Sequence, residues 1–437
     1  MLTLFNRWRR ELDDRFRYGA LSRALLSRWT AWRAGWMRRG DPQQRADVVA
    51  RLCAAARLAN SDAAIARLQE RIRREVASLD QTKVDLGPFA AALGSNWMVK
   101  AAILKPYRGP REKGVIFVSF ESQWAKLLRY GDVRDFASRY TLVVSPSSSP
   151  HNLVNYLFAA NYPEPYFTLI SNPEDLVELP RVSDRLLIVP LFASHWVNPD
   201  LFQTPPLASR PFDLLMVASF GKVKRHHILF RALRNMPRDL RVLLIGQDQE
   251  GRTAETIRQE ARWYGVEDRF ELRANQPFLK VVEAFGQAKT SLVLSKREGS
   301  CVVVAESMFA DTPVALLHGA HLGSRVFINE QTGRFLLERF LSWQLTEFIR
   351  DAERFKPRAW ALENISCFRS SERLNTMLKE HALARGEEWT QDIRPLNWRP
   401  DPMLVRPDDR LELEAERRAI LDRYGLLIGR SADGQTD

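Results

Sequence analysis

Two glutamates, Glu298 and Glu306, are the side chains whose spacing best suggests chemistry. They lie in the segment 291–317, which reads SLVLSKREGSCVVVAESMFADTPVALL. The pattern predicts a strand, a loop that carries Glu298 and Gly299, and a helix that begins near Ser300. Eight helical residues span up to about 12 Å, which is wider than the roughly 5 to 9.5 Å between the two carboxylates of a glycosidase. The spacing therefore suits the two ends of one long ligand.

The predicted start of that helix suits a phosphate group. Backbone N–H groups at a helix N-terminus have no intrahelical partner and carry partial positive charge. The residues expected to contact the ligand there are Gly299, Ser300, Cys301 and Val302. A nucleotide-diphosphate sugar fits this arrangement, with the diphosphate at the helix start and a carboxylate at either end. Two solvated glutamates reach the same spacing by chance, so the prediction depends on the order of strand, Glu-Gly, helix, Glu, Pro and strand.

This order resembles the retaining glycosyltransferases of group 1, also called family 4. Their GT-B fold has two Rossmann-like domains facing a cleft, and their C-terminal domain carries an E-x7-E motif followed by a small-residue-Pro-Val strand. Glu298, Glu306 and the segment 311–314 (DTPV) match that pattern. The resemblance implies that Glu298 orients the donor sugar and that Glu306 holds the ribose. It also implies transfer with retention at the anomeric carbon, with no metal and no cofactor beyond the donor itself.

A second segment supports the resemblance. Residues 217–232 (VASFGKVKRHHILFRA) resemble the first strand and the lysine-containing turn of the family's C-terminal domain. Lys224 falls on the family lysine that contacts the donor diphosphate, which implies a catalytic role beside Glu298. Considered by charge alone, Lys222 and Lys224 are equally a solvated basic turn.

One position departs from the family pattern. Ser219 stands where the family has an arginine, and Lys222 or Arg225 is the candidate to supply the missing charge. Gly246 ends a strand where the family has a glycine-ended strand, so it is counted with Ser219 and Lys222 among the donor-binding residues. The departure at Ser219 keeps a non-catalytic scaffold of the same fold open as an alternative. A GT-B epimerase or phosphorylase is a further alternative within the class.

The positive charge of the chain concentrates at its N-terminus. The net charge is +12, and residues 1–85 hold 18 Lys or Arg against 10 Asp or Glu. Apolar residues three or four apart predict two basic amphipathic helices on either side of Gly19; they are Phe5, Trp8, Leu12 and Phe16, then Leu25, Trp29, Trp32 and Trp36. Such helices dock on an anionic membrane or on a partner. They also pack their apolar stripe on the protein's own body, whereas nucleic acid is not expected without a reading motif.

The length and the residue pattern predict an α/β chain with more than one domain, since 437 residues exceed the usual size of a single domain. From about residue 97, short β-branched and aromatic runs alternate with helical segments, which predicts parallel sheets with crossover helices. We expect four regions: a basic helical region (1–93), an N-terminal Rossmann-like acceptor domain (94–205), a C-terminal Rossmann-like nucleotide-sugar domain (206–385), and a helical extension with a frayed tail (386–437). Both Rossmann-like domains are expected to be doubly wound.

The remaining sequence features concern compartment and partners. The three cysteines, Cys53, Cys301 and Cys367, have no C-x-x-C spacing, and no secretion signal or transmembrane segment is readable. Isolated histidines such as His151 and His195 are more often structural than catalytic. We therefore expect a cytoplasmic enzyme, peripheral at the inner membrane face. Its expected partners are a nucleotide-sugar donor and a lipid-linked saccharide or polysaccharide acceptor.

Overall fold

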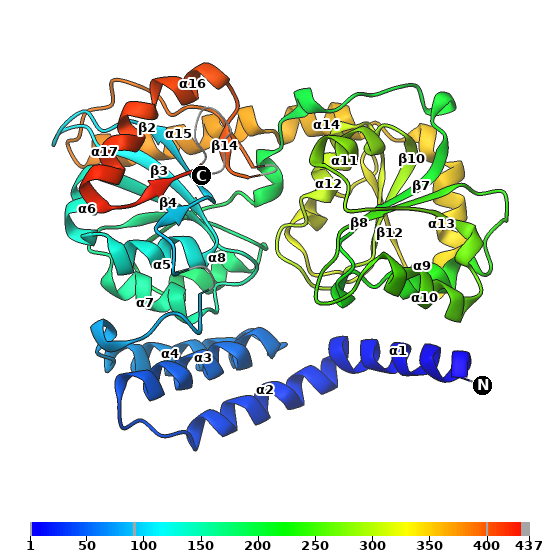
Figure 1. Cartoon of the computed structure of the whole chain (residues 1–437), viewed down its shortest axis with the longest axis horizontal. Coiled ribbons are helices and arrows are strands. Elements are labelled where there is room, and N and C mark those ends of the chain that lie inside the picture. The colour runs from blue at the N-terminus through cyan, green and yellow to red at the C-terminus, as the bar shows by residue number, and fades with distance from the viewer. Residues whose placement is uncertain (1, 91–92, 399–400, 430–437) are drawn as a thin grey trace. The chain divides into compact units, whose positions relative to one another are not determined.

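The chain folds into two compact units. The computed structural model describes residues 2–90, 93–398 and 401–429, so the predicted frayed tail at 430–437 lies outside the described residues. Unit 1 consists of residues 1–18 and 197–366, and unit 2 of residues 19–196 and 367–437. Each unit contains one main sheet with helices around it (Figure 1).

The sheet of unit 1 has six parallel strands. Their order is β12-β11-β10-β7-β8-β9. The strands are β7 (Phe212–Val217), β8 (Val242–Gly246), β9 (Glu271–Ala274), β10 (Ala288–Val293), β11 (Val314–Leu317) and β12 (Gly333–Leu336). The chain runs outward from β7 to β9, returns, and runs outward the other way from β10 to β12. This is the doubly wound order of a Rossmann fold, and ligands bind such sheets at the carboxyl ends of the two central strands, where the order reverses.

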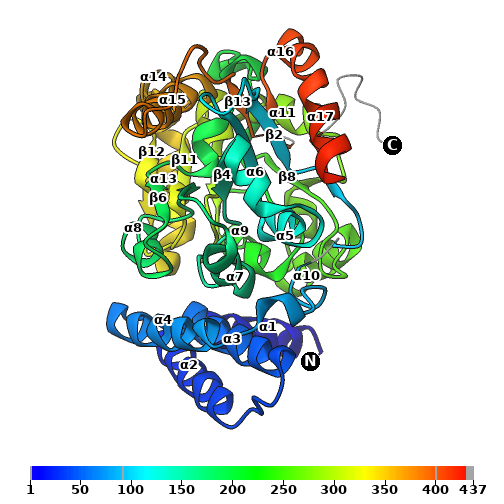
Figure 2. The same ribbon diagram turned by 90° about the vertical axis from the view of Figure 1, so that its left-hand side faces the viewer.

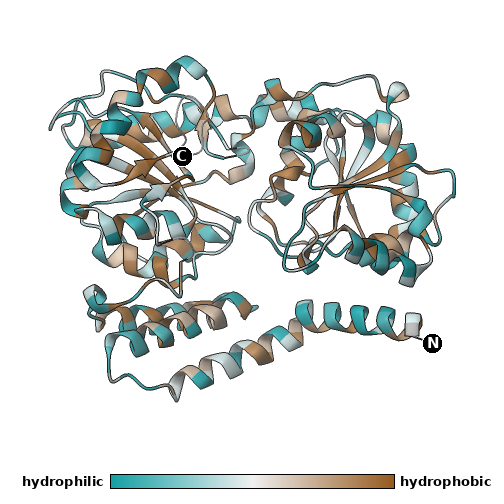
Figure 3. Ribbon diagram, viewed as in Figure 1, coloured by the Kyte–Doolittle hydropathy of each residue, from teal (hydrophilic) through white to brown (hydrophobic). Residues whose placement is uncertain are grey.

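Helices surround this sheet and bury its central strands. They are α1 (Leu2–Tyr18), α9 (His226–Leu233), α10 (Ala254–Tyr264), α11 (Phe278–Phe285), α12 (Val303–Phe309), α13 (Leu341–Arg350) and α14 (Pro357–Asn364). Helix α1 packs on the outside of this layer against α10. Every residue of β8 is buried, as expected for a parallel strand covered on both faces. Figure 3 shows the central strands in the hydrophobic colour range and much of α1 in the hydrophilic range.

The sheet of unit 2 has five strands in the order β2-β3-β4-β5-β6. They are β2 (Ala101–Lys105), β3 (Gly114–Ser119), β4 (Tyr140–Ser145), β5 (Tyr166–Leu169) and β6 (Leu186–Val189). Only β2 is antiparallel to its neighbour. The strands follow chain order across this sheet, so the described part of unit 2 lacks the reversal of strand order that the expected doubly wound arrangement requires. Tyr166 and Phe167 are consecutive on β5, so their side chains point to opposite faces of the sheet. Tyr166 contacts Phe158 of α7 (Leu153–Asn161), and Phe167 contacts His381 of α15 (Cys367–Ala384), with ring centroids 5.3 and 5.4 Å apart. Helices thus cover both faces.

The other elements of unit 2 lie at its N-terminal and C-terminal ends. The helices are α2 (Ala20–Gly35), α3 (Pro42–Leu58), α4 (Asp62–Ala77), α5 (Glu121–Tyr130), α6 (Val133–Arg139), α8 (Asp175–Glu178), α16 (Pro407–Glu412) and α17 (Glu414–Tyr424). β1 (Trp97–Met98) pairs with β15 (Leu427–Ile428), and β13 (Leu396–Asn397) with β14 (Met403–Leu404). Helix α3 packs against both α2 and α4 (Figure 2). Asp41 and Ser61 cap α3 and α4 by accepting a hydrogen bond from a backbone N–H of the first turn.

The structure divides the chain differently from the four expected regions. Helix α1 belongs to unit 1 and α2 to unit 2, with Gly19 alone between them. The reason is that charged side chains of α1 pair with side chains of unit 1, as described below. Helix α15 was expected in the C-terminal domain but lies in unit 2, where Ser370 Oγ donates to the carbonyl oxygen of His195 at 2.9 Å. The chain passes between the units at 196/197, nine residues before the expected boundary at 205/206.

Candidate functional site

The two predicted catalytic residues meet at the central edge of the unit 1 sheet. Lys224 ends a short 3-10 turn that follows β7, and Glu298 lies in the loop that follows β10. The two strands are neighbours, so both loops leave the same edge. Lys224 Nζ donates to Glu298 Oε1 at 2.5 Å, and the two side chains are 22% and 14% exposed. An accessible ion pair therefore lies where the strand order reverses, the position at which such sheets bind ligands.

The loop that carries Glu298 has a defined backbone. Glu298 N donates to the carbonyl oxygen of His321 at 3.0 Å. The carbonyl oxygens of Gly299 and Ser300 accept from the N–H groups of residues 323 and 324 at 2.9 and 3.0 Å. Because the segment after β11 holds this loop from one side, the Glu298 side chain projects from a fixed support.

Helix α12 begins later than the sequence suggests. Its first residue is Val303, with Val302 as its N-cap, whereas the expected start was near Ser300. Cys301 has a φ of 56°, in the left-handed region that a right-handed helix excludes. The interval between the two glutamates is therefore part loop and part helix. The 12 Å estimate for eight continuous helical residues does not apply to it.

Cys301 is half-buried beside the ion pair. Burial raises the pKa of its thiol, and the negative charge of Glu298 raises it further. The thiol is therefore protonated at neutral pH, whereas a nucleophilic cysteine acts as the thiolate. Its contribution to a ligand site is limited to its backbone and its shape.

Glu306 lies in the first turn of α12 and is 1% exposed. Its backbone N donates to the carbonyl oxygen of Val302 at 3.1 Å, which fixes it to the loop that carries the candidate phosphate-binding groups. The structure thus places Glu306 on the inner side of the same strand–loop–helix element as Glu298. Gly299 to Val302 lie between the two.

The residues near the missing family arginine have other partners. Ser219 Oγ donates a short hydrogen bond to Gln249 Oε1. Arg225 is 1% exposed and its guanidinium bonds to the carboxylates of Asp14 and Glu338, so its charge is already neutralised. Lys222 also has a carboxylate partner, Asp13, at 3.3 Å, but both side chains of this pair are accessible to a ligand, so Lys222 remains the candidate to compensate for the serine.

Gly246 has a packing role in the structure. It ends β8, and a Cβ atom at this position would lie 2.3 Å from Phe220 Cε1 and 2.4 Å from the carbonyl oxygen of Ala218. Only glycine permits such a close approach. Gly246 therefore shapes the segment that leads into the turn at Lys222 to Lys224.

Helix α1 contributes to this region, which the sequence did not reveal. Arg10 donates to Glu260 at 2.8 Å and to the carbonyl oxygen of Lys222 at 3.2 Å. Asp13 and Asp14 on the same helix pair with Lys222 and Arg225, respectively. The helical pattern shows which residues share a face but not which face is buried. One feature of the sequence could have indicated the buried face of α1. The first 40 residues contain ten arginines but only three acidic residues, and all three lie between positions 11 and 14.

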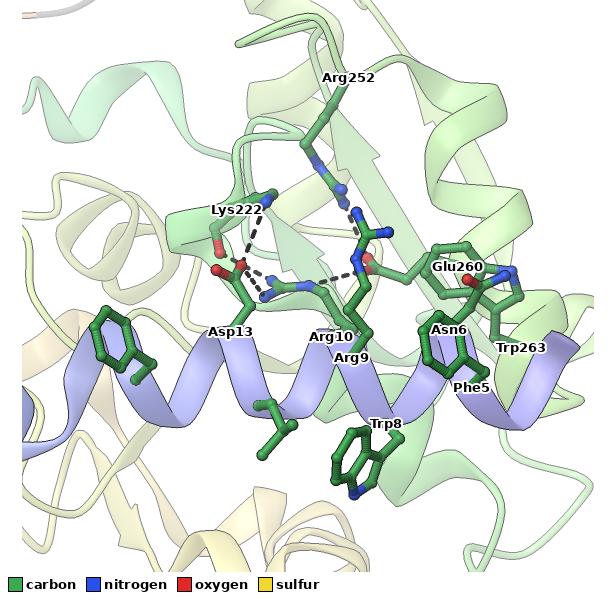
Figure 4. Close-up of a pocket in the computed structure, with 12 residues that line it drawn as sticks. Phe5, Asn6, Trp8, Arg9, Arg10, Asp13, Lys222, Arg252, Glu260 and Trp263 are labelled. Atoms are coloured by element: carbon green, nitrogen blue, oxygen red, sulfur yellow. Dashed lines mark hydrogen bonds and ion pairs between the residues drawn. The ribbon is translucent and has the colours of Figure 1, made fainter.

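A hollow of about 710 Å³ lies along α1. Its lining includes Trp8, Arg9, Lys222, Arg252 and Trp263. Figure 4 shows Arg10 and Asp13 pointing toward Lys222 and Glu260, while Trp8 points away from them. The hollow borders the turn through Lys222 only, whereas the Lys224–Glu298 pair lies at the other end of that turn. We therefore place the candidate site at the ion pair and not in the hollow.

The histidines of unit 2 have structural partners. His151 Nε2 lies 2.8 Å from Glu178 Oε2, and His195 Nδ1 accepts from Phe192 N at 2.9 Å. Burial lowers the pKa of His195 to about 3, so it is neutral at physiological pH. Across residues 2–90, 93–398 and 401–429, no group of three or more metal-ligating side chains converges.

Known proteins resemble the part of the chain that carries this site. Residues 197–358, less than half of the chain, match the family model described as glycosyl transferases group 1. No curated protein matches the chain in sequence.

Solved structures resemble this one at low identity. The pneumococcal O-GlcNAc transferase GtfA in complex with UDP and GlcNAc is 16% identical (TM-score 0.45), over 61% of this chain and 57% of that one. The chain thus spans less than two thirds of that transferase. Sucrose-phosphate synthase from Thermosynechococcus elongatus is 16% identical (TM-score 0.48), over 62% and 74%. HepE from Anabaena in complex with UDP is 14% identical (TM-score 0.48), over 60% and 78%.

The family match and the topology concern the same residues. The matched range includes Lys224, Glu298 and Glu306 together with the whole doubly wound sheet. Both units are Rossmann-like, which is the composition of the GT-B fold. Residues 197–358 are thus similar to the group 1 glycosyl transferases, and this similarity supports a glycosyltransferase.

Proposed function

We propose that the protein transfers a sugar from a nucleotide-diphosphate sugar to a saccharide acceptor, with retention at the anomeric carbon. The observation that carries the proposal is the contact between Lys224 and Glu298 at the carboxyl ends of β7 and β10. A cation and a carboxylate at this edge suit a ligand that has both a diphosphate and sugar hydroxyls.

Each residue has a role in this proposal. Lys224, helped by Lys222, stabilises the negative charge that develops on the departing diphosphate. The backbone N–H groups near Ser300 to Val303 bind phosphate oxygens. Glu298 orients the donor sugar, and Glu306 holds the ribose. Because Glu298 neutralises Lys224 in the structure, the arriving diphosphate competes with Glu298 for the ammonium group and leaves the carboxylate available to sugar hydroxyls.

We further propose that the acceptor is a lipid-linked saccharide or a growing polysaccharide at an anionic membrane surface, the inner face of the cell membrane. The support is the outer face of α1, where Phe5, Trp8, Leu12 and Phe16 are exposed, Trp8 by 63%. Charged residues occupy the opposite, inward face. Soluble proteins rarely expose such a row of large apolar side chains without a partner.

Helix α2 has the same inverted arrangement within unit 2. Its buried residues are Arg23, Ser27, Thr30 and Ala34. The exposed large residues are Leu21, Leu25, Trp29 and Trp32 on the helix and Trp36 at its C-cap. Arginines accompany both rows, with Arg33 lying 4.9 Å from the ring centroid of Trp29. Aromatic and basic side chains together are typical of helices that lie in the headgroup layer of anionic membranes. None of the described helices has the length and apolar character needed to cross a bilayer.

The proposal is tested by nucleotide binding and by turnover. Millimolar nucleoside diphosphates and nucleotide sugars, tested as a panel, should raise the unfolding temperature of the full chain, since a ligand that binds only the native state stabilises it. Glu306→Ala should weaken this effect, because the ribose loses its partner. Glu298→Ala should mainly lower turnover with the nucleotide sugar that binds best.

The second candidate is a non-catalytic scaffold that docks on a membrane or a partner. The observation in its favour is Ser219 in place of the family arginine, with its hydroxyl bonded to Gln249. If no nucleotide or nucleotide sugar shifts the unfolding temperature, the scaffold is the correct interpretation. Isomerisation of the donor sugar, or phosphate-dependent cleavage with no saccharide acceptor present, would point instead to an epimerase or a phosphorylase.

A further inference from the structure

We propose that helix α1 is a clamp that holds the turn at residues 222–225 in the conformation that presents Lys224 to Glu298. Asp14 is the positioning residue of this clamp. The inference rests on the proposed function, because the turn matters only if Lys224 binds a donor. Arg225 is the residue on which α1 and the turn converge.

Arg225 has an unfavourable backbone conformation. Its φ is 56° and its ψ is 40°, which places it in the left-handed region. Residues with a side chain adopt this region at a cost in free energy, whereas glycine adopts it freely. A non-glycine residue remains there when its surroundings determine its position. The contacts of the arginine side chain must therefore hold the backbone of the turn.

These contacts come from three separate elements. Arg225 Nε and Nη2 donate to the two carboxylate oxygens of Asp14 on α1 at 2.8 and 2.7 Å. Nη1 donates to the carbonyl oxygen of Leu294, just after β10, at 3.3 Å, and Nη2 also donates to Glu338 at 2.8 Å. Burial alone would lower the pKa of Arg225, but Asp14 and Glu338 outweigh it and raise the pKa. The guanidinium thus stays charged and joins α1, the turn and the end of β10.

Asp14 makes the most directional of these contacts. Two parallel hydrogen bonds between a guanidinium and one carboxylate fix both distance and orientation. Asp14 is 8% exposed and Glu338 is 34% exposed, so water screens the first pair less. The pair with Asp14 therefore contributes most to holding Arg225.

Two more residues of α1 hold the other end of the turn. Arg10 donates to the carbonyl oxygen of Lys222. Asp13 accepts a hydrogen bond from the Nζ atom of Lys222 at 3.3 Å. Arg10, Asp13 and Asp14 are three and four residues apart, so they share one face of the helix. That face contacts the first and the last residue of the turn.

Lys224 lies inside the segment that α1 holds at both ends. Lys224 N donates to the carbonyl oxygen of Gly221, and Arg225 N to that of Lys222, at 3.1 and 3.2 Å. A change in the backbone at Arg225 therefore displaces its neighbour Lys224. Loss of Asp14 should move the Lys224 ammonium away from Glu298 and weaken donor binding, although α1 is distant in sequence from both residues.

The test uses the full chain, UDP as the probe, and Arg225→Gly as a rescue. Asp14→Asn should weaken UDP binding in calorimetric titration by roughly five- to 150-fold, the usual range of coupling between two sites. It should also speed hydrogen exchange at the backbone amides of residues 222–226. Glycine takes a positive φ without cost. The double variant Asp14→Asn/Arg225→Gly should therefore bind UDP more tightly than Asp14→Asn alone.

Glu11→Gln is the matched control, because Glu11 lies on α1 and pairs with Arg231 of α9 instead of the turn. It should leave UDP affinity unchanged. If Asp14 only stabilises the fold, Asp14→Asn and the double variant should both unfold at a lower temperature than the natural chain. The double variant should then bind UDP no more tightly than Asp14→Asn. If the natural chain binds UDP and Asp14→Asn binds it equally well, or if the double variant shows no rescue, the clamp is wrong and the proposed function stands. If the natural chain binds no nucleotide, the proposed function fails and the donor role of the clamp fails with it.

Discussion

At the scale of single residues, the charge of the candidate site is balanced before any ligand arrives. Lys224 pairs with Glu298, and Lys222 pairs with Asp13. A paired lysine keeps one conformation, so under the proposed function the donor diphosphate would meet an ammonium group that is already positioned. The Glu298 carboxylate, which faces this ammonium group, is then close to where a donor sugar would lie.

Replacing the central lysine should therefore affect turnover more than folding. Lys224→Met should lower the rate of sugar transfer by about 100- to 1,000-fold, the usual loss when one group that stabilises developing charge is removed. Initial rates with a saturating nucleotide sugar measure the effect. Lys280→Met is the control, because Lys280 is an exposed residue of α11 paired only with its neighbour Glu283. Equal rates for the two variants would rule out the proposed role of Lys224.

A second residue gives a prediction about pH. Asp175 in unit 2 is 3% exposed and accepts from the backbone N–H groups of Ser171 and Asn172 at 2.6 and 3.2 Å. Burial raises its pKa to about 7, against 3.8 for the free side chain. Between these two values the native state binds a proton that the unfolded state has lost, so stability falls as the pH rises through this window and then levels off.

Asp175→Asn should remove this dependence, since an amide oxygen accepts the same hydrogen bonds without ionising. At pH 8 the unfolding temperature of this variant should exceed that of the natural chain. The shift should be roughly 2–4 °C for each kcal/mol by which the free energy of unfolding increases. The difference should be small at pH 4. Thermal unfolding at four or five pH values tests this, with the exposed Asp184→Asn as control. A difference that stays constant from pH 4 to pH 8 would contradict the assignment.

At the scale of elements, α1 and α2 have their apolar side chains outward and their polar side chains inward. This arrangement changes how the membrane proposal has to be tested. Deletion of residues 1–40 would remove the inward face of α1 from unit 1 and that of α2 from unit 2, and so would disturb both. Substitution on the outward faces leaves those contacts intact.

The triple variant Trp29→Ala/Trp32→Ala/Trp36→Ala should lose binding to vesicles of phosphatidylcholine and phosphatidylglycerol. Each aromatic side chain that moves fully from water into the membrane contributes about 1.5–3 kcal/mol to binding. Removing three of them should therefore cause a large loss of vesicle binding in a sedimentation assay. Trp343→Ala is the matched control, because Trp343 is 65% exposed but lies on α13. Sedimentation of the triple variant at the level of Trp343→Ala would show that α2 does not dock on lipid.

The elements also show how far the sequence determines the structure. The short apolar runs at 212–218 and 291–295 predicted strands that the structure contains as β7 and β10, because a buried parallel strand needs a short, continuous apolar run. The spacing of Trp29, Trp32 and Trp36 predicted a helix but not its outward face, since periodicity alone does not specify a neighbour. The start of α12 was misplaced because the left-handed conformation of Cys301 follows from tertiary contacts of the loop. The pairing of Asp14 with Arg225 was equally invisible, since 210 residues separate them along the chain.

At the scale of the whole molecule, unit 1 is assembled from two separate stretches of chain. Residues 1–18 supply α1, and residues 197–366 supply the sheet and the other helices. Glu260 is 1% exposed because Arg10 covers it, and Arg225 is buried against Asp14. The longer stretch alone therefore exposes charges that α1 neutralises in unit 1.

The two stretches should recombine as separate molecules. The fragment 197–366 should unfold at a lower temperature than unit 1 of the full chain, and a peptide of residues 1–18 should raise that temperature in a saturable way. At a peptide concentration 100 times its Kd, the stabilisation is about 2.7 kcal/mol. A peptide with Arg10→Ala, Asp13→Asn and Asp14→Asn should give little effect. If the natural peptide fails to stabilise the fragment, the charged face of α1 is not what holds it to unit 1.

The interrupted path of unit 1 has a consequence for the order of events during synthesis. Helix α1 leaves the ribosome before the surface it covers, which is translated only after the 178 residues from 19 to 196. At about 5–20 residues per second, the wait is roughly 10–40 s, during which its aromatic side chains are accessible to chaperones or to a nearby bilayer. A nascent chain that reached lipid in this interval would be tethered there before the sheet of unit 1 was translated, so the site of translation would decide where the folded protein is located.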